Sequence, residues 1–209
     1  MTCYILAFLL GTLAGGAYGA LRPAPGAGRP GRTLPALLTG LANGALWTLC
    51  FLRLGPCWDA ALCCALASVL LAAALTDART GEIPPLCSLA ALVLGAARLL
   101  FDLSAWPQRL LGLVAVAGPL LLLLLLSKGR AIGGGDVKLL AGCGLFLGWK
   151  LIVLAFFLAC ILGSVIHLVR MRFFGAGRSL ALGPYLAAAV FVSMLWGQGL
   201  LEAYLGLFR

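Results

Sequence analysis

Two aspartates, each at the edge of a long apolar run, are the residues of this chain best suited to chemistry. Asp77 ends the apolar run 70–76, and Asp136 follows the three glycines at 133–135. The chain has only six acidic residues, and a carboxylate beside a membrane-length apolar segment is costly unless it is paired or functional. Two carboxylates at the same membrane depth can share a proton and activate a water molecule, so the pair predicts acid–base hydrolysis.

The chemistry of such a pair follows from its charge. Like charges in a poorly solvated site do not both ionise readily, so one pKa rises and the pair holds one proton near neutral pH. The ionised member then takes a proton from water, and the protonated member donates to the scissile carbonyl oxygen, as in an aspartic protease. The sequence leaves open which aspartate takes which part.

Asp136 also has a purely structural interpretation. It lies at or just before the start of a helix that begins at Val137, where it could cap free backbone N–H groups. The preceding glycines remove side chains and permit positive φ, so the backbone there can bend tightly and approach a substrate strand. Lys138 is either a charge neighbour of Asp136 or a contact for substrate backbone and developing charge.

The segment after Asp77 predicts the end of one helix and the start of another. It turns at Gly81 and restarts at Pro84, because proline suits the first turn of a helix. Asp77 could there be an interfacial residue paired with Arg79. Glu82, in the same loop, is either a solvated charge or a group that tunes the aspartates or binds a basic peptide.

The composition is that of a membrane protein. Hydrophobic residues make up 63% and charged residues 10% of the 209 residues, against about 45–50% and about 25% in soluble domains. Lipid offers backbone groups no partner, so most of the chain must be helix. A span needs roughly 20 apolar residues, and the length therefore predicts an all-α, polytopic transmembrane helical bundle of about seven or eight spans. We expect one membrane domain over 1–209 and no soluble domain.

Apolar runs and polar punctuation place the spans. The predicted spans are 3–21, 35–53, 58–76, 85–101, 108–127, 137–148, 150–170 and 180–207. The first is expected to be a retained span rather than a signal peptide, because no basic region precedes it. The sixth is short, and with the seventh it forms either a tight helical hairpin or one broken helix. The Pro- and Gly-rich stretch 22–33 predicts an irregular, mobile loop.

The formal net charge is +9, and the distribution of the basic residues among the loops indicates the membrane topology. With eight spans, alternate connections fall on two faces. One face carries Arg22, Arg29, Arg32, Arg79, Lys128, Arg130, Lys138, Arg170, Arg172 and Arg178, and the other carries Arg53, Arg98, Arg109, Lys150 and Arg209. The richer face is expected to be cytoplasmic, and both aspartates belong to it. The scattered basic residues indicate contact with membrane lipid headgroups rather than with nucleic acid.

The cysteines and the histidine predict no metal site. None of the eight cysteines forms a C-x-x-C pair, most lie in apolar runs, and zinc-ligand spacing is absent. His167, the only histidine, lies inside an apolar span and is interpreted as a packing residue.

The two aspartate motifs together resemble a known family. The pattern Asp77-x5-Ile83-Pro84, followed by Gly-Gly-Gly-Asp-Val-Lys at 133–138, resembles the type IV prepilin peptidases. These are bacterial polytopic aspartic proteases of the G-x-G-D class. The stretches Leu-Leu-Ala-Gly at 139–142 and Leu-Ala-Leu-Gly-Pro-Tyr at 180–185 are also similar to that family, so the resemblance covers nearly the whole chain.

The resemblance implies a function and its residues. Asp77 and Asp136 are the expected catalytic pair. The expected substrate-binding or supporting residues are Gly133, Gly135, Lys138, Glu82 and Pro84. The family cleaves type IV prepilins and pseudopilins after a glycine, at the cytoplasmic boundary between a short basic leader and an apolar helix. The resemblance thus implies a multi-pass protein of the bacterial inner membrane, its active site facing the cytoplasm, with no metal or cofactor.

One departure from the family concerns a second activity. Many members carry a cytoplasmic domain with two C-x-x-C pairs between the first two spans, and they N-methylate the new N-terminus with S-adenosylmethionine. Here that position holds only the short loop 22–33, which has no cysteine. The resemblance therefore implies a short, peptidase-only form and calls the methyltransferase activity into question.

Two other classes of function stay open. A small transporter would use the same aspartates as proton or cation relays, although both lie near one membrane face rather than at the midplane. A catalytically inactive assembly protein would bind pilin without needing either aspartate.

Overall fold

The computed structural model describes residues 2–21, 33–128, 132–174 and 182–207, and every regular element within these ranges is helical. The all-α prediction is therefore confirmed over the described ranges. The chain divides into two compact units, Met1–Ala72 and Ala73–Arg209, so the expected single membrane domain stays a prediction. Apart from Thr33, the loop predicted at 22–33 lies outside the described residues.

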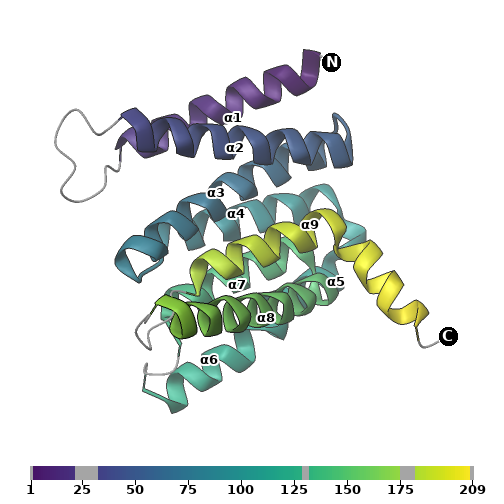
Figure 1. The fold of residues 1–209 in the computed structure, drawn as a ribbon. Coiled ribbons are helices and arrows are strands. Elements are labelled where there is room, and N and C mark those ends of the chain that lie inside the picture. Colours follow the sequence, from purple (N-terminus) through teal and green to yellow (C-terminus); the bar gives the residue numbers. More distant parts are fainter. Residues whose placement is uncertain (1, 22–32, 129–131, 175–181, 208–209) are drawn as a thin grey trace. The chain divides into compact units, whose positions relative to one another are not determined.

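The first unit is built on a close helix pair, α1 (Thr2–Leu21) and α2 (Thr33–Leu54), which lie side by side (Figure 1). Glycines on both helices face each other. A Cβ added to Gly11 would lie 2.9 Å from the Cα of Gly44. Small residues let helix backbones approach closely, which is how apolar helices associate when lipid competes for their larger side chains.

A buried polar chain ties this pair to the first part of α3 (Trp58–Thr80). Asn43 Nδ2 donates to the Gly11 carbonyl oxygen at 2.9 Å. Ser68 Oγ donates to Asn43 Oδ1 at 3.0 Å, and Trp47 Nε1 donates to Ser68 Oγ at 2.8 Å. Because each of these polar groups has a hydrogen-bond partner, the network can stabilise the apolar unit without leaving any of them unpaired.

The second unit holds the end of α3 and the remaining helices. They are α4 (Pro85–Phe101), η2 (Leu103–Ala105), α5 (Trp106–Ala115), α6 (Ala117–Leu126), α7 (Gly134–Leu147), α8 (Trp149–Phe174) and α9 (Gly183–Gly206). Helix α7 packs against α4 and α5, and α8 runs beside α9 (Figure 1). The side chains of Leu139, Leu140 and Phe146 are almost fully buried, so α7 is a central helix of this unit.

The helix lengths suit a membrane protein. In the part of the chain that the structure describes, five helices are long and apolar enough to span a bilayer: Pro35–Leu54, Trp58–Thr80, Leu103–Leu126, Trp149–Phe173 and Gly183–Gly206. Shorter apolar helices cover Cys3–Gly19 and Pro85–Phe101. Helix α7 has 14 residues, or about 21 Å, in line with the short sixth span. These helices occupy the eight predicted positions.

The predicted span 108–127 overlaps the candidate membrane span Leu103–Leu126, but two helices form it. Helices α5 and α6 meet at Val116, which has φ −105° and ψ −45°. Pro119 explains the break. Its ring has no N–H and collides with the carbonyl group four residues earlier, that of Ala115.

The predicted sixth and seventh spans are likewise separate helices. Helices α7 and α8 are joined by Gly148, whose φ of 84° ends α7. Two guanidinium groups meet the last turn of α7: Arg109 Nη1 and Arg98 Nη1 donate to the Phe146 carbonyl oxygen at 2.7 and 3.3 Å. Cations are favourable at a helix C-terminus, so these arginines anchor the end of α7 opposite Asp136.

Candidate active site

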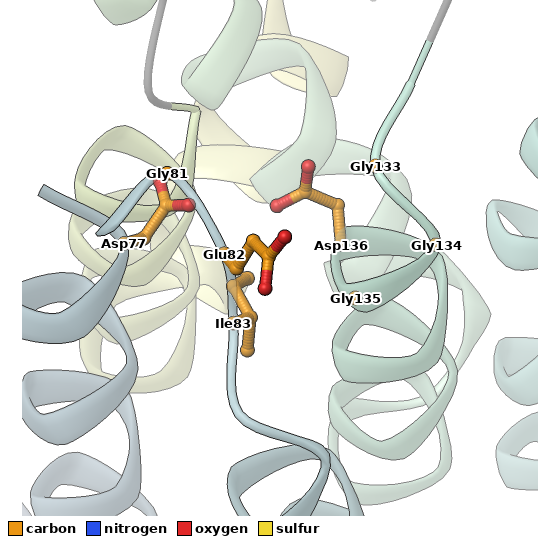
Figure 2. Close-up of a pocket in the computed structure, with 8 residues that line it drawn as sticks. All are labelled: Asp77, Gly81, Glu82, Ile83, Gly133, Gly134, Gly135 and Asp136. Atoms are coloured by element: carbon orange, nitrogen blue, oxygen red, sulfur yellow. The ribbon is translucent and has the colours of Figure 1, made fainter. Parts of the chain in front are cut away.

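A pocket of about 370 Å³ lies at one end of the second unit (Figure 2). It is lined by Asp77, Gly81, Glu82, Ile83, Gly133, Gly134, Gly135 and Asp136. These residues come from the end of α3, the α3–α4 connection and the start of α7. In Figure 2, Asp77 and Asp136 point toward one another from the two helices. The structure thus brings together the two motifs that the sequence singled out.

Asp77 lies in the last turn of α3. The predicted span ended at residue 76, but α3 continues to Thr80, so Asp77 is inside the helix rather than after it. The residue is 5% exposed. Its Oδ2 accepts the backbone N–H of Gly183, the first residue of α9, at 2.8 Å. Arg79, the partner considered from the sequence, is exposed.

Asp136 is the third residue of α7, so the helix-capping interpretation is wrong. The N-cap is Gly133, with φ −70° and ψ 134°, and no side chain caps the helix. Asp136 Oδ1 is buried and accepts no hydrogen bond. Burial, and secondarily the negative charge of Asp77, raise the pKa of Asp136 to about 6. Burial thus favours the protonated form of the Asp136 carboxyl, which lies ahead of the apolar part of α7.

The glycines before Asp136 do not provide the expected tight bend, whereas the expected approach to a substrate strand stays a prediction. The residues with positive φ do not include Gly133, Gly134 or Gly135. Instead, Gly135 packs against Ile83: a Cβ added there would lie 3.0 Å from Ile83 Cβ and 3.2 Å from its carbonyl oxygen. The close approach is thus to this chain's own loop, and it sets the α3–α4 connection against the first turn of α7.

The α3–α4 connection follows the predicted plan. Gly81 has φ 70°, and its N–H donates to the Asp77 carbonyl oxygen at 2.8 Å, which closes the end of α3 in the usual glycine conformation. Thr80 Oγ1 donates to the Glu82 carbonyl oxygen at 3.2 Å. Pro84 is the N-cap of α4. The predicted turn and helix restart are confirmed.

The other candidate residues divide into two groups. Glu82 is exposed and lines the pocket, and in Figure 2 its carboxylate appears between the two aspartates. Lys138 is exposed, and neither it nor Pro84 is among the residues that line the pocket. His167 is half-buried within α8, away from the pocket lining. The supporting roles expected for Lys138 and Pro84 thus lack a pocket contact.

One residue of the site escaped the sequence analysis. Gly183 belongs to the stretch 180–185 that resembles the family, but no role was assigned to it. The available signal was a glycine and a proline at a helix start, Gly183 and Pro184, which indicates a constrained turn but not its partner. The partner, Asp77, is 106 residues away in the sequence.

The arrangement is suited to acid–base chemistry. Three carboxylates line the pocket, and among the residues that the structure describes no lysine or arginine joins them in its lining. Asp77 has a backbone donor while Asp136 Oδ1 has none, so the two carboxyls are chemically unequal, as one base and one acid require. Within the described ranges, no group of three or more His, Cys, Asp or Glu side chains is placed to hold a metal ion.

Comparison with known proteins gives a family match. The profile of the type IV leader peptidase family matches residues 64–168 of this chain. That range includes both aspartates, the α3–α4 connection and all of α7. No solved structure gives a significant match.

Several curated relatives carry the name prepilin leader peptidase/N-methyltransferase. The protein from Pseudomonas aeruginosa is 31% identical over 180 residues, which cover 82% of this chain and 60% of the relative. The protein from Burkholderia pseudomallei is 34% identical over 171 residues, 77% of this chain and 54% of the relative. That from Aeromonas salmonicida is 35% identical over 83 residues, 39% and 28% of the two chains. The chain spans about 60% of the length of the first two relatives, from Pseudomonas aeruginosa and Stutzerimonas stutzeri.

Proposed function

Because this chain belongs to the type IV leader peptidase family, we propose that it is an integral membrane aspartic endopeptidase. It removes the basic leader from prepilin or pseudopilin precursors by cutting after a glycine. The observation that carries the proposal is that Asp77 and Asp136 line one pocket from the ends of two different helices. The site faces the cytoplasm of a bacterial cell, because its connections belong to the face predicted to be richer in basic residues.

The reaction uses the inequality of the two carboxyl groups. Asp77, ionised, takes a proton from water as the water oxygen attacks the scissile carbonyl carbon. Asp136, protonated, gives its proton to the carbonyl oxygen, so the intermediate is a neutral gem-diol. One gem-diol hydroxyl then returns a proton to Asp136, while Asp77 passes its proton to the departing nitrogen as the C–N bond breaks. The products are a carboxylic acid and an amine, and both aspartates regain their starting states.

The shape and charge of the site suit such a substrate. A helical peptide bond is shielded by its own hydrogen bonds, so the substrate must unwind where it is cut, and a glycine beside the scissile bond eases this. Glu82 adds a third, exposed carboxylate to the pocket lining. It contacts the lysine or arginine residues of the leader, while the apolar part of the substrate helix stays in the membrane.

The test is cleavage by purified protein in detergent. A prepilin-type precursor is incubated with the wild type and with Asp77→Asn, Asp136→Asn and Glu202→Gln, and new N-termini are mapped by mass spectrometry. Glu202 is an exposed acid of α9 outside the pocket lining, so its variant is the control. We expect a cut after the leader glycine that both aspartate variants lose and Glu202→Gln keeps. Proton-coupled flux in vesicles without any cleavage would instead support the transporter.

A further inference from the structure

The first residue of α9 makes a buried contact with one of the two aspartates. Gly183 N donates to Asp77 Oδ2 at 2.8 Å, and both residues are buried. A carboxylate that accepts a backbone N–H is held in place and has its negative charge stabilised. The hydrogen bond therefore fixes the position of the Asp77 carboxylate.

The contact leaves no room for a side chain at this position. A Cβ added to Gly183 would lie 2.6 Å from Asp77 Oδ2, 2.7 Å from its Cβ and 2.8 Å from its Cγ. Real Cβ atoms essentially never approach other atoms this closely. Any other residue at position 183 must therefore displace either the Asp77 carboxylate or the start of α9.

The start of α9 has no side-chain cap of its own. Leu182 is the N-cap and makes no side-chain hydrogen bond, and the first turn carries no acidic residue. Pro184, the next residue, has no backbone N–H to donate. Asp77 from α3 thus supplies the negative charge that a helix N-terminus favours.

The residues around Asp77 show why its contact with the start of α9 is important. Asp136 and Glu82, which line the same pocket, are acidic residues as well, so neither is a cationic partner for Asp77. The first turn of α9 contains Tyr185 but no lysine or arginine. The backbone N–H and the positive end of α9 are then the favourable partners that this helix offers the carboxylate.

We infer that Gly183 is a positioning residue of the catalytic pair: its N–H holds the Asp77 carboxylate in place in the pocket that it shares with Asp136. The inference rests on the proposed peptidase function. It gives α9 a part in the reaction, although α9 contributes no residue to the pocket lining.

Two variants and a control test the inference. Gly183→Ala introduces the colliding Cβ. Replacement of Gly183 by glycolic acid, through nonsense suppression in cell-free synthesis, removes the N–H and adds no atom that could collide. Gly199→Ala is the control on the same helix, because an added Cβ there meets nothing within 4 Å. Cleavage is measured as kcat and KM across pH, beside the unfolding temperature.

For both Gly183 variants we expect kcat to fall about tenfold or more, with KM within about twofold of the wild type. The shape of the pH–rate profile should change as well, because the Asp77 carboxylate is no longer held by its backbone donor. Gly199→Ala should match the wild type. If the glycolic acid variant keeps the wild-type kcat and pH profile, or if only the unfolding temperature changes, the positioning role is refuted.

A measurement without substrate separates this inference from the peptidase itself. Infrared spectra of protein with 13C-labelled aspartate report the hydrogen bonding of the carboxyl groups, and Asp77→Asn identifies the band of Asp77. The band of Asp77 should shift in the glycolic acid variant, because the carboxylate loses the N–H donor of residue 183. An unchanged band refutes the inference even if cleavage occurs, whereas a shifted band without any cleavage refutes the proposed function alone.

Discussion

Gly135 packs so closely against Ile83 that a Cβ on the glycine would lie 3.0 Å from the Cβ of the isoleucine. This contact joins the first turn of α7, which carries Asp136, to the connection that follows Asp77. The neighbouring Gly134 has room, since its nearest atom to an added Cβ, on Leu124, is 3.9 Å away. The two glycines are therefore unequal, although the sequence presents them as one run.

The first prediction compares these two glycines. Gly135→Ala should lower kcat/KM by about tenfold, because Ile83 must shift and a small misplacement of catalytic groups has large effects. Gly134→Ala should leave kcat/KM within about twofold of the wild-type value. It should slightly raise the unfolding midpoint, since alanine is a better helix former than glycine by about 1 kcal/mol. Cleavage rates and unfolding midpoints in detergent check both. Equal effects of the two substitutions would contradict the close contact with Ile83.

The second prediction concerns pH and Asp136. Its pKa is raised to about 6, so the folded protein binds this proton more tightly than the unfolded chain. The stability from this group is therefore present at low pH and is lost as pH rises through about 6. Asparagine at position 136 cannot ionise, so the Asp136→Asn variant does not lose this stability. Its free energy of unfolding, relative to that of the wild type, should therefore grow with rising pH and level off above about pH 6.

Unfolding midpoints of the two proteins at matched pH values measure this difference. Because Asp136 must donate a proton, wild-type kcat/KM should also decline on the alkaline side of the same pKa. A stability difference that is flat across pH would show that the Asp136 carboxyl is not buried beside a second charge.

The third prediction concerns Glu82, the exposed carboxylate of the pocket. Glu82→Gln should raise KM for a basic leader by about two- to fivefold and leave kcat nearly unchanged, because an exposed ion pair contributes about 1 kcal/mol or less. Glu82→Lys should prefer a precursor whose leader lysines are changed to glutamate. Steady-state kinetics with both precursors measure this, and Glu202→Gln again serves as control. Equal responses of the two precursors to Glu82→Lys would rule out a contact with the leader.

The fourth prediction concerns the far end of α7. Arg109 is 8% exposed; its Nη1 donates to the Phe146 carbonyl oxygen at 2.7 Å and its Nη2 to Asp102 Oδ2 at 3.1 Å. Arg109→Ala should lower the free energy of unfolding by about 2 kcal/mol, because it removes hydrogen bonds from a charged group. Arg98→Ala should lower the free energy of unfolding by a smaller amount, since Arg98 donates to the same carbonyl oxygen at the longer distance of 3.3 Å. Denaturant titrations rank the two, and the reverse order would contradict this account.

Much of the fold follows from local signals. Apolar run length and polar punctuation predict the helix positions, and Gly81 and Pro84 predict the turn and restart between α3 and α4. Pro119 inside an apolar run is also a local signal, and it accounts for the break between α5 and α6 that the single predicted span left out.

The remaining features depend on contacts between distant residues. Helix α3 continues past the predicted end to Thr80, and the carboxylate of Asp77 finds a partner in the N–H of Gly183, 106 residues later. Helix α7 starts at Gly134 rather than after Asp136, and Gly135 in its first turn packs against Ile83. The sequence around each aspartate does not show these partners. The pairing of the aspartates could therefore be predicted from the sequence, but their positions within the helices could not.

The most direct test of the central claim is single-turnover cleavage of a prepilin-type precursor in ¹⁸O-labelled water. If Asp77 and Asp136 activate water directly, the released leader carries one ¹⁸O in its new C-terminal carboxylate, and neither Asp77→Asn nor Asp136→Asn forms this product. Cleavage that persists in both variants, or a folded wild type that leaves several such precursors intact, would contradict the account.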